Sequence, residues 1–266
     1  NPYFKLFGDM NIRKGNYSLT FLKYEPYSFF PLDEINVYEN DFYREESNIA
    51  TFEKEYKYLS LLKNNTIWMC ITPNEINTMK PYIEKAKGNV LVVGLGLGYF
   101  AYMASLKPEV KSITIIEKEK EIIDLFEQFL LPHFSMKNKI KIVSEDAYKV
   151  MSKKFVNNFD FTFIDIWHNA EDGLPMYLKF VKTLGYQNNI CYWLEESMIC
   201  LYRRCILILM EEQLNNLGDS SYSKSKNDFD KIINDLYFKT KNKFFNNFQE
   251  INSYLQKENI KKIILD

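Results

Sequence analysis

The sequence is poor in the residues that build metal centres and disulfide frameworks. It has four cysteines, none of them in a Cys-x-x-Cys pair, and only two histidines among 266 residues. A structural zinc site needs four such ligands at characteristic spacings, which this sequence does not offer. We therefore expect no metal site, and we expect reduced thiols of the kind found in a cytoplasmic protein.

Long apolar runs and an excess of one charge are also missing. The longest strongly apolar run covers only residues 205–210, whereas a membrane helix needs about 20 residues. The formal net charge of -1 gives no general attraction for nucleic acid or anionic lipid. The opening NPYFKLFGDM has no basic start followed by an apolar core, so no secretory signal is expected.

Glycine is scarce, yet three of the nine glycines stand together. An apolar run from Val90 ends in Gly94-Leu95-Gly96-Leu97-Gly98, and a second apolar run over 112–116 ends in Glu117. With a helix between them, the two runs predict a βαβ unit that has a glycine turn after its first strand.

Strand and helix patterns alternate on both sides of this unit. Thr72-Pro73-Asn74-Glu75 predicts a helix start in which Thr72 caps, Pro73 occupies the first position and Glu75 closes a capping box. We expect strands at 90–93, 112–116, 139–143 and 159–164, and a strand at 189–193 is an alternative to a helix that begins at residue 191. The expected helices cover 72–87, 98–106, 118–130, 146–153 and 171–183. Such alternation predicts a doubly wound α/β fold with a mostly parallel sheet.

The flanking regions differ from this core. Aromatic residues and short alternating patches in 1–65 predict a small β-rich N-terminal extension. The α/β core is expected to cover 66–190, and a helical C-terminal part 191–266. That part would include one long apolar helix at 191–214, a loop at 218–227 and a lysine-rich helical end.

Three acids follow successive predicted strands, at the edge where open α/β sheets bind ligands. Glu117 follows the second strand and can accept both hydroxyls of a ribose. Asp146 follows the third and can accept an adenine amino group, with the Ala147 N–H donating to a ring nitrogen. Asp165 follows the fourth strand.

The glycine turn itself narrows the choice of ligand. A dinucleotide site usually has a third small residue where Tyr99 stands, and the spacing here is GxGxG instead of GxGxxG. A GxGxG turn suits a ligand whose carboxylate and amine lie over Gly94, Gly96 and Gly98. S-adenosylmethionine has both groups.

The order of these motifs resembles the class I S-adenosylmethionine-dependent methyltransferase fold over about residues 70 to 185. The resemblance is greatest to its spermidine synthase-like branch, in the run IIEKEKEIIDLFEQFLLPHF, the SEDA step and the FDFTFIDIW step. It implies that Gly94, Gly96 and Gly98 line the methionine part, Glu117 the ribose, and Asp146 and Ala147 the adenine. Asp165 would match the acid that helps to deprotonate the attacking amine.

Two departures bear on the reaction. Spermidine synthases carry an aspartate inside the glycine turn where this chain has Leu97. After Asp165 the chain reads Ile-Trp-His, which is not the Asp/Asn-Pro-Pro-aromatic pattern of methyltransferases that act on base amino groups. Nucleic acid is therefore disfavoured as a substrate.

Catalytic candidates cluster after the fourth strand. Asp165 is expected to act as the base, and His168 is the nearby histidine that titrates in the useful range. Trp167 is expected either to cover a cation or to pack between the strand end and the next helix. Glu195 and Glu196 either close the pocket or are ordinary acids at a helix start.

Three functions stay open on the sequence alone. The first is methyl transfer from S-adenosylmethionine to an unidentified small molecule, such as an amine. The second is aminopropyl transfer from decarboxylated S-adenosylmethionine, which nine acids against two bases in 25–55 would favour if that segment is a lid for a cation rather than a solvated face. The third is a non-catalytic nucleoside-binding or interaction module. The long apolar helix, at 192–214, would suit a homodimer surface in an enzyme and in such a module alike.

Overall fold

The computed structural model describes residues 2–8, 10–215 and 227–266. The chain divides into two compact units. Unit 1 comprises Asn1–Glu34, Ser47–His168 and Tyr186–Trp193, and unit 2 comprises Ile35–Glu46, Asn169–Gly185 and Leu194–Asp266. The predicted loop at 218–227 lies, apart from Asn227, outside the described residues.

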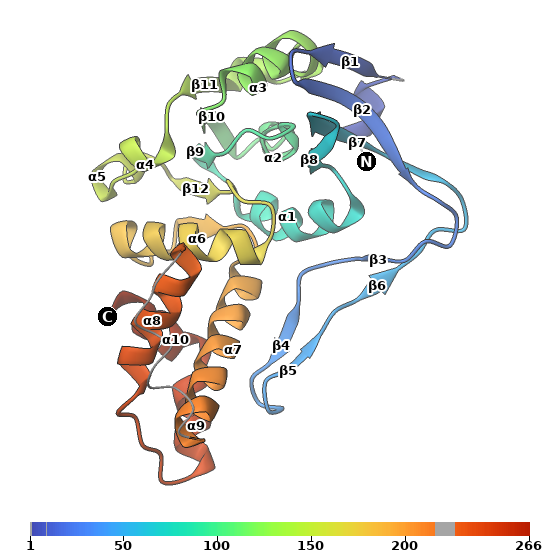
Figure 1. Ribbon diagram of the computed structural model, residues 1–266. Helices are drawn as coiled ribbons and strands as arrows, with labels where there is room; N and C mark the ends of the chain where they lie inside the picture. The colour runs from blue at the N-terminus through green and yellow to red at the C-terminus, as the bar shows by residue number, and fades with distance from the viewer. Residues whose placement is uncertain (1, 9, 216–226) are drawn as a thin grey trace. The chain divides into compact units, whose positions relative to one another are not determined.

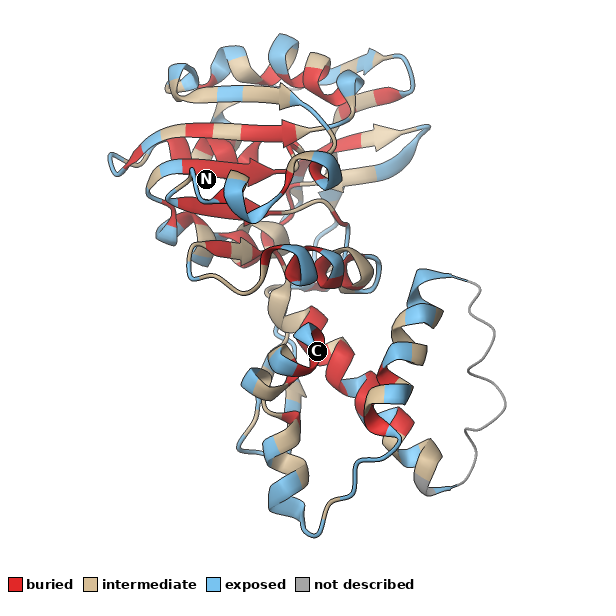
Figure 2. Ribbon diagram, turned by 90° about the vertical axis from the view of Figure 1, so that its left-hand side faces the viewer, coloured by how far each residue is buried: buried red, intermediate tan, exposed pale blue. Residues whose placement is uncertain are grey.

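Unit 1 contains a five-stranded parallel sheet in the order β11-β10-β9-β12-β13. Its strands are β9 (Gly88–Val93), β10 (Val110–Glu117), β11 (Ile140–Ser144), β12 (Phe161–Ile164) and β13 (Ile190–Tyr192). The central strands β9 and β12 carry continuous buried runs that are apolar apart from Thr162, because a parallel strand inside an α/β fold is covered on both faces. Figure 2 shows these strands largely in the colour of buried residues.

The strand order reverses beside β9. The chain proceeds outward from β9 to β10 and β11, and then returns to the other side of β9 to form β12 and β13 (Figure 1). This reversal is what makes the fold doubly wound, and open α/β sheets bind ligands at the carboxyl ends of the strands beside such a reversal, which here are β9 and β12. The fold class predicted from the sequence is confirmed.

Helices of unit 1 connect and cover the strands. They are α1 (Pro73–Lys85), α2 (Tyr99–Ser105), α3 (Lys120–Leu125), a π-helical turn η2 (Phe126–Leu130), α4 (Ala147–Val150) and α5 (Lys153–Val156). Phe100 of α2 stacks on Phe163 of β12 at 4.2 Å between ring centroids, and Tyr82 of α1 lies 5.2 Å from the same ring. Helices α1 and α2 thus pack on one face of β12.

The N-terminal part of unit 1 forms a separate antiparallel sheet in the order β1-β2-β7-β8. These strands are β1 (Asn11–Lys14), β2 (Tyr17–Tyr24), β7 (Tyr56–Lys63) and β8 (Thr66–Cys70), and β3 (Phe30–Pro31) pairs with β6 (Ile49–Ala50). The predicted β-rich N-terminal extension is therefore confirmed as a set of hairpins. The division of the chain at residues 65 and 190 stays a prediction.

Unit 2 consists of a hairpin and five helices among the described residues. The hairpin pairs β4 (Asn36–Tyr38) with β5 (Arg44–Glu46). The helices are α6 (Ala170–Leu184), α7 (Glu195–Leu214), α8 (Asp228–Thr240), α9 (Phe248–Leu255) and α10 (Lys257–Leu265). Helix α7 has 20 residues, but no helix in the described part of the chain is both long and apolar enough to cross a membrane.

Two sequence-based element assignments were wrong in detail. The helix expected at 191–214 begins only at Glu195, because 190–192 pairs with β12 as a strand and Leu194 adopts a left-handed conformation with φ 58°. The helix expected at 146–153 is two short helices, interrupted where Met151 adopts an extended conformation and Ser152 caps α5.

Candidate active site

The glycine turn joins the end of β9 to the start of α2. Gly94, Gly96 and Gly98 have φ values of 99°, 56° and 73°, which L-residues with side chains rarely adopt. A Cβ atom on Gly94 would lie 1.9 Å from the backbone oxygen of Asp165, and one on Gly98 would lie 2.2 Å from the ring of Phe126. Backbone conformation and close approach therefore both require glycine in this turn.

Glu117 is the last residue of β10 and its carboxylate holds the glycine turn. Oε2 accepts a hydrogen bond from the Leu95 N–H at 3.1 Å, and Oε1 accepts one from the Glu119 N–H at 2.8 Å. A carboxylate offers about four lone-pair sites. The half-buried Glu117 thus keeps acceptor capacity for hydroxyl groups beside the turn.

Asp146 and Ala147 lie at the end of the neighbouring strand. Ser144, which ends β11, pairs in register with Glu117, so the carboxyl ends of the two strands meet at one edge. Asp146 caps α4, because its Oδ1 accepts from the Tyr148 N–H at 2.9 Å. Ala147 is the first residue of α4. The sequence predicts that its N–H and the second carboxylate oxygen of Asp146 bind adenine.

Asp165 lies directly beside the glycine turn. Its N–H donates to the carbonyl of Val93 at 2.8 Å, and its own carbonyl is the atom that leaves Gly94 no room for a side chain. Burial raises the pKa of the Asp165 carboxyl to about 8. Burial therefore disfavours the ionised form of the Asp165 carboxyl.

Glu75 is a site residue whose role the sequence reasoning missed. The Thr72 hydroxyl caps α1 by accepting from the Glu75 N–H at 3.4 Å, as predicted. The Glu75 carboxylate, which was expected to close a capping box, instead accepts a hydrogen bond from the Cys70 thiol, with 3.8 Å between Sγ and Oε1. Burial, and next the charge of Asp165, raise the pKa of Glu75 to about 8.

Glu75 and Asp165 thus form a pair of half-buried carboxyls whose charges interact. Like charges in one site oppose each other's ionisation, and burial opposes both. The only sequence signal for this pairing is the position of the Thr-Pro-Asn-Glu helix start just upstream of the glycine turn. The sequence cannot show that β8 and α1 bring Cys70 and Glu75 to Asp165.

His168 and Trp167 have different environments. His168 is exposed, and its ring meets Trp68 of β8 edge to face at 5.0 Å between centroids. Trp68 also lies under the Lys63 ammonium, 4.5 Å from the ring centroid. Trp167 is buried and donates from Nε1 to the Trp193 carbonyl at 3.1 Å, so it packs below the site and does not cover a ligand.

The acids of segment 25–55 are largely paired with cations of this chain. Six of the nine form ion pairs within their own unit: Glu25 and Glu55 with Lys23, Asp41 and Glu46 with Arg44, Glu39 with Arg203, and Glu45 with Arg204. This pairing favours the interpretation of segment 25–55 as a structural, solvated surface over its interpretation as a lid for a cationic substrate.

Glu195 and Glu196 also have partners inside unit 2. Glu195 accepts from the Tyr177 hydroxyl at 2.9 Å and pairs with Lys261, and Glu196 pairs with Lys257. These contacts tie the start of α7 to α6 and α10. The contacts favour the interpretation of Glu195 and Glu196 as ordinary acids at a helix start.

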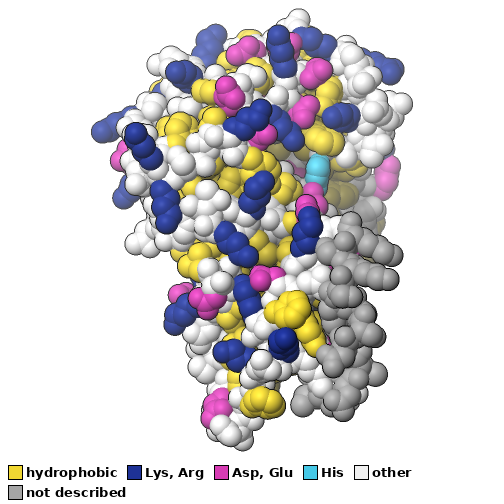
Figure 3. All heavy atoms as spheres, turned by 60° about the vertical axis from the view of Figure 1, so that its left-hand side comes forward, with side chains coloured by type: hydrophobic (Ala, Val, Ile, Leu, Met, Phe, Trp, Pro, Cys, Tyr) yellow, Lys and Arg dark blue, Asp and Glu magenta, His cyan; other side chains and the backbone are white. Residues whose placement is uncertain are grey.

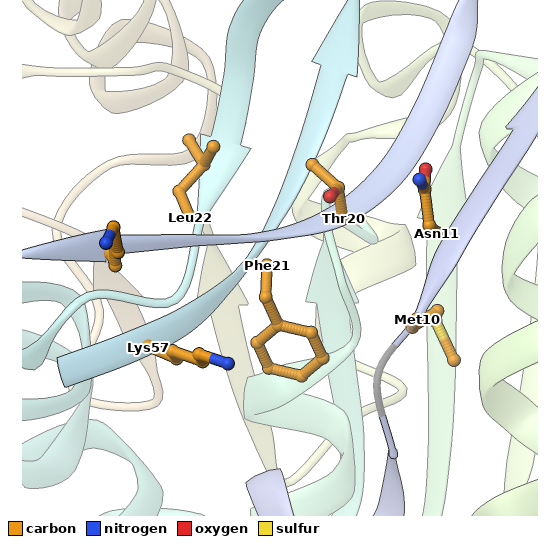
Figure 4. Close-up of a pocket in the computed structure, with 7 residues that line it drawn as sticks. Met10, Asn11, Thr20, Phe21, Leu22 and Lys57 are labelled. Atoms are coloured by element: carbon orange, nitrogen blue, oxygen red, sulfur yellow. The ribbon is translucent and has the colours of Figure 1, made fainter. Parts of the chain in front are cut away.

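A shallow hollow on the N-terminal sheet is separate from these residues. Figure 4 shows it between β1, β2 and β7, and none of the predicted site residues lines it. Its lining consists of Met10, Asn11, Thr20, Phe21, Leu22, Lys23 and Lys57. On the face in Figure 3, basic side chains are spread among acidic and apolar ones and do not gather in one patch.

Comparisons with known proteins give partial structural similarity only. No model of a protein family matches the sequence, and no curated protein is similar to it. A spermidine synthase from Thermotoga maritima is 12% identical, with 64% of this chain and 68% of that chain covered at a TM-score of 0.39. A spermidine synthase in complex with the transition state analogue AdoDATO is also 12% identical, with 67% and 69% covered at 0.38.

A putative S-adenosylmethionine-dependent methyltransferase from Streptococcus mutans is 14% identical, with 55% of this chain and 43% of that chain covered at a TM-score of 0.33. Spermidine synthases and a methyltransferase are thus among the similar structures, as the resemblance of the sequence implies. The sheet order of unit 1, not these similarities, establishes the fold class. What those proteins bind is a property of those proteins.

Proposed function

We propose that unit 1 binds S-adenosylmethionine and that the chain is a methyltransferase whose acceptor is a small amine. The observation that carries this proposal is the position of Asp165, a half-buried acid of raised pKa in direct backbone contact with the glycine turn. Strongly perturbed acids are typical of functional sites, and open α/β sheets bind ligands where the strand order reverses.

The residues around the turn fit this cofactor. Gly94, Gly96 and Gly98 would lie along the methionine part, because their backbone can approach a ligand closely. The Glu117 carboxylate is already fixed against the turn and would accept from ribose hydroxyls. Asp146 and Ala147 would bind adenine at the end of the adjacent strand.

The cofactor, when bound, supplies an electrophilic methyl group on a sulfonium. The work of the chain is then to orient an amine and to accept its proton. A carboxyl with a pKa near 8 suits a general base, since efficiency is greatest when the pKa lies near the operating pH. Asp165 takes that role in its ionised form, and the Glu75 carboxyl, whose pKa is raised by burial and by the charge of Asp165, offers a second acceptor for amine hydrogens.

His168 remains the second titratable candidate. Its exposed ring against Trp68 places it at the solvent side of the strand end that carries Asp165. We assign His168 the exchange of a proton with solvent. Full turnover by a His168→Gln variant would show that His168 has no role in the reaction.

Aminopropyl transfer from decarboxylated S-adenosylmethionine is the second candidate. The Glu75–Asp165 pair is compatible with it, because two acids suit an amine acceptor in that reaction as well as in methyl transfer. Leu97 opposes it, since its buried apolar side chain replaces the aspartate that spermidine synthases carry inside the turn.

Titration calorimetry with S-adenosylmethionine and S-adenosylhomocysteine tests the binding step. Replacing Glu117 by Gln should weaken binding roughly a hundredfold, because hydrogen bonds to an ionised carboxylate are lost. Glu121→Gln, an exposed change on α3, is the matched control and should leave the affinity unchanged. Equal affinities in all three proteins would refute the proposed site.

A turnover assay separates the candidate functions. Purified protein is incubated with either S-adenosylmethionine or its decarboxylated form and a panel of mono-, di- and polyamines. Methylated amine with the first cofactor supports the proposal, and aminopropylated amine with the second supports the alternative. Tight binding without product from any amine would identify a non-catalytic nucleoside-binding module.

A further inference from the structure

Tyr3 reaches the glycine turn from the far end of the sequence. Its side chain is completely buried, and its hydroxyl donates to the carbonyl of Leu97 at 2.5 Å. Leu97 stands between Gly96 and Gly98, so this bond joins the N-terminal segment to the centre of the turn.

The Tyr3 ring is fixed by an aromatic cluster of unit 1. It makes edge-on contacts, with centroid distances from 5.1 to 6.2 Å, to rings of the N-terminal segment, of α2 and of the loop before β11. Those rings are Phe4, Phe7, Tyr99, Tyr102 and Phe134. Because the ring is held on several sides, the direction of its hydroxyl is set before any ligand binds.

The turn needs such external bonds. Three glycines in five residues leave its backbone with many accessible conformations, and ordering them costs entropy. Glu117 holds one side of the turn through the Leu95 N–H, and Tyr3 holds the other through the Leu97 carbonyl. Removing the Tyr3 hydroxyl would leave that carbonyl without this donor in a buried place.

We propose that Tyr3 is a positioning residue of the cofactor site, which fixes the glycine turn in its binding conformation. This inference rests on the proposed function, since the turn is the part of unit 1 assigned to the methionine portion of the cofactor. The N-terminal segment therefore contributes to the cofactor site.

The test compares Tyr3→Phe with Tyr102→Phe. Tyr3→Phe removes the hydroxyl and keeps the ring in its cluster. Tyr102→Phe makes the same chemical change in the same cluster, on a ring that contacts Tyr3 and Phe134. Calorimetry with S-adenosylmethionine and S-adenosylhomocysteine gives the affinity, and hydrogen exchange of the amides in 94–99 reports the order of the turn.

In Tyr3→Phe we expect about tenfold weaker binding and about tenfold faster exchange at 94–99, whereas Tyr102→Phe should match the wild type in both. Exchange at 94–99 that is unchanged in Tyr3→Phe would overturn the inference. If the wild type binds neither probe, the proposed function fails by itself. The exchange comparison then still decides whether Tyr3 holds the turn.

Discussion

At the scale of single residues, Asp165 links function to the pH dependence of stability. Its pKa is raised from 3.8 to about 8 by burial, so the folded chain binds this proton more tightly than the unfolded chain does. Stability from this group is fully present below about pH 4 and is lost as the pH rises through about 8. The ionised Asp165 carboxylate therefore lowers the stability of the folded chain in the pH range where a general base is useful.

Asp165→Asn should consequently stabilise the protein at alkaline pH while it removes turnover. We expect little change in Tm at pH 5 and a gain on the order of 5 °C at pH 9, measured by calorimetry. Asp124→Asn on α3 is the control, with no pH-dependent gain expected. A lower Tm for Asp165→Asn at pH 9 would show that the ionised carboxylate is stabilised in the fold.

Residues of the site differ in how far the sequence could identify them. Gly94, Glu117 and Asp165 could be predicted, because strand periodicity places each at a strand end and parallel strands align their ends. Glu75 could not be predicted as a partner of Asp165. Its local sequence is an ordinary helix start, and only the packing of α1 and β8 brings its carboxylate to the site.

At the scale of elements, the side chains of two lysines cap the C-terminal ends of helices in unit 1. Lys107 Nζ donates to the carbonyls of Ile83, Glu84 and Ala86 at 2.9, 2.6 and 2.7 Å, at the end of α1. Lys139 Nζ donates to carbonyls at the end of α2, those of Ser105 and Lys107. Each ammonium satisfies carbonyls that a helix leaves unpaired and complements the helix dipole.

Lys107→Met should therefore destabilise the protein although it keeps most of the side-chain volume. Three carbonyls lose a charged donor, so we expect a loss of about 1–3 kcal/mol in the free energy of unfolding, measured by urea denaturation. Lys111→Met, an exposed change on β10, should have almost no effect. Equal losses in the two variants would argue against a capping role for Lys107.

At the scale of the whole molecule, the assignment of hairpin β4–β5 to unit 2 depends on contacts that are distant in sequence. Arg203 of α7 is 4% exposed, and it pairs with Glu39 at 3.0 Å and donates to the Leu255 carbonyl at 2.8 Å. Glu39 also accepts from the Lys257 N–H at 2.7 Å. Aromatic residues and alternation in 1–65 predict a β-rich part, but they cannot predict a partner about 160 residues away.

Arg203→Met tests whether the two units open independently. Removing one partner of a buried ion pair costs about 3–5 kcal/mol, because Glu39 keeps its charge without this arginine. We expect faster hydrogen exchange in 35–46 and 195–214, and unchanged exchange in 88–117, since those strands belong to unit 1. Arg204→Met, at a half-exposed pair with Glu45, should change exchange much less. Faster exchange in both units would instead identify one cooperative structure, in which the cofactor affinity of unit 1 should fall together with the stability of unit 2.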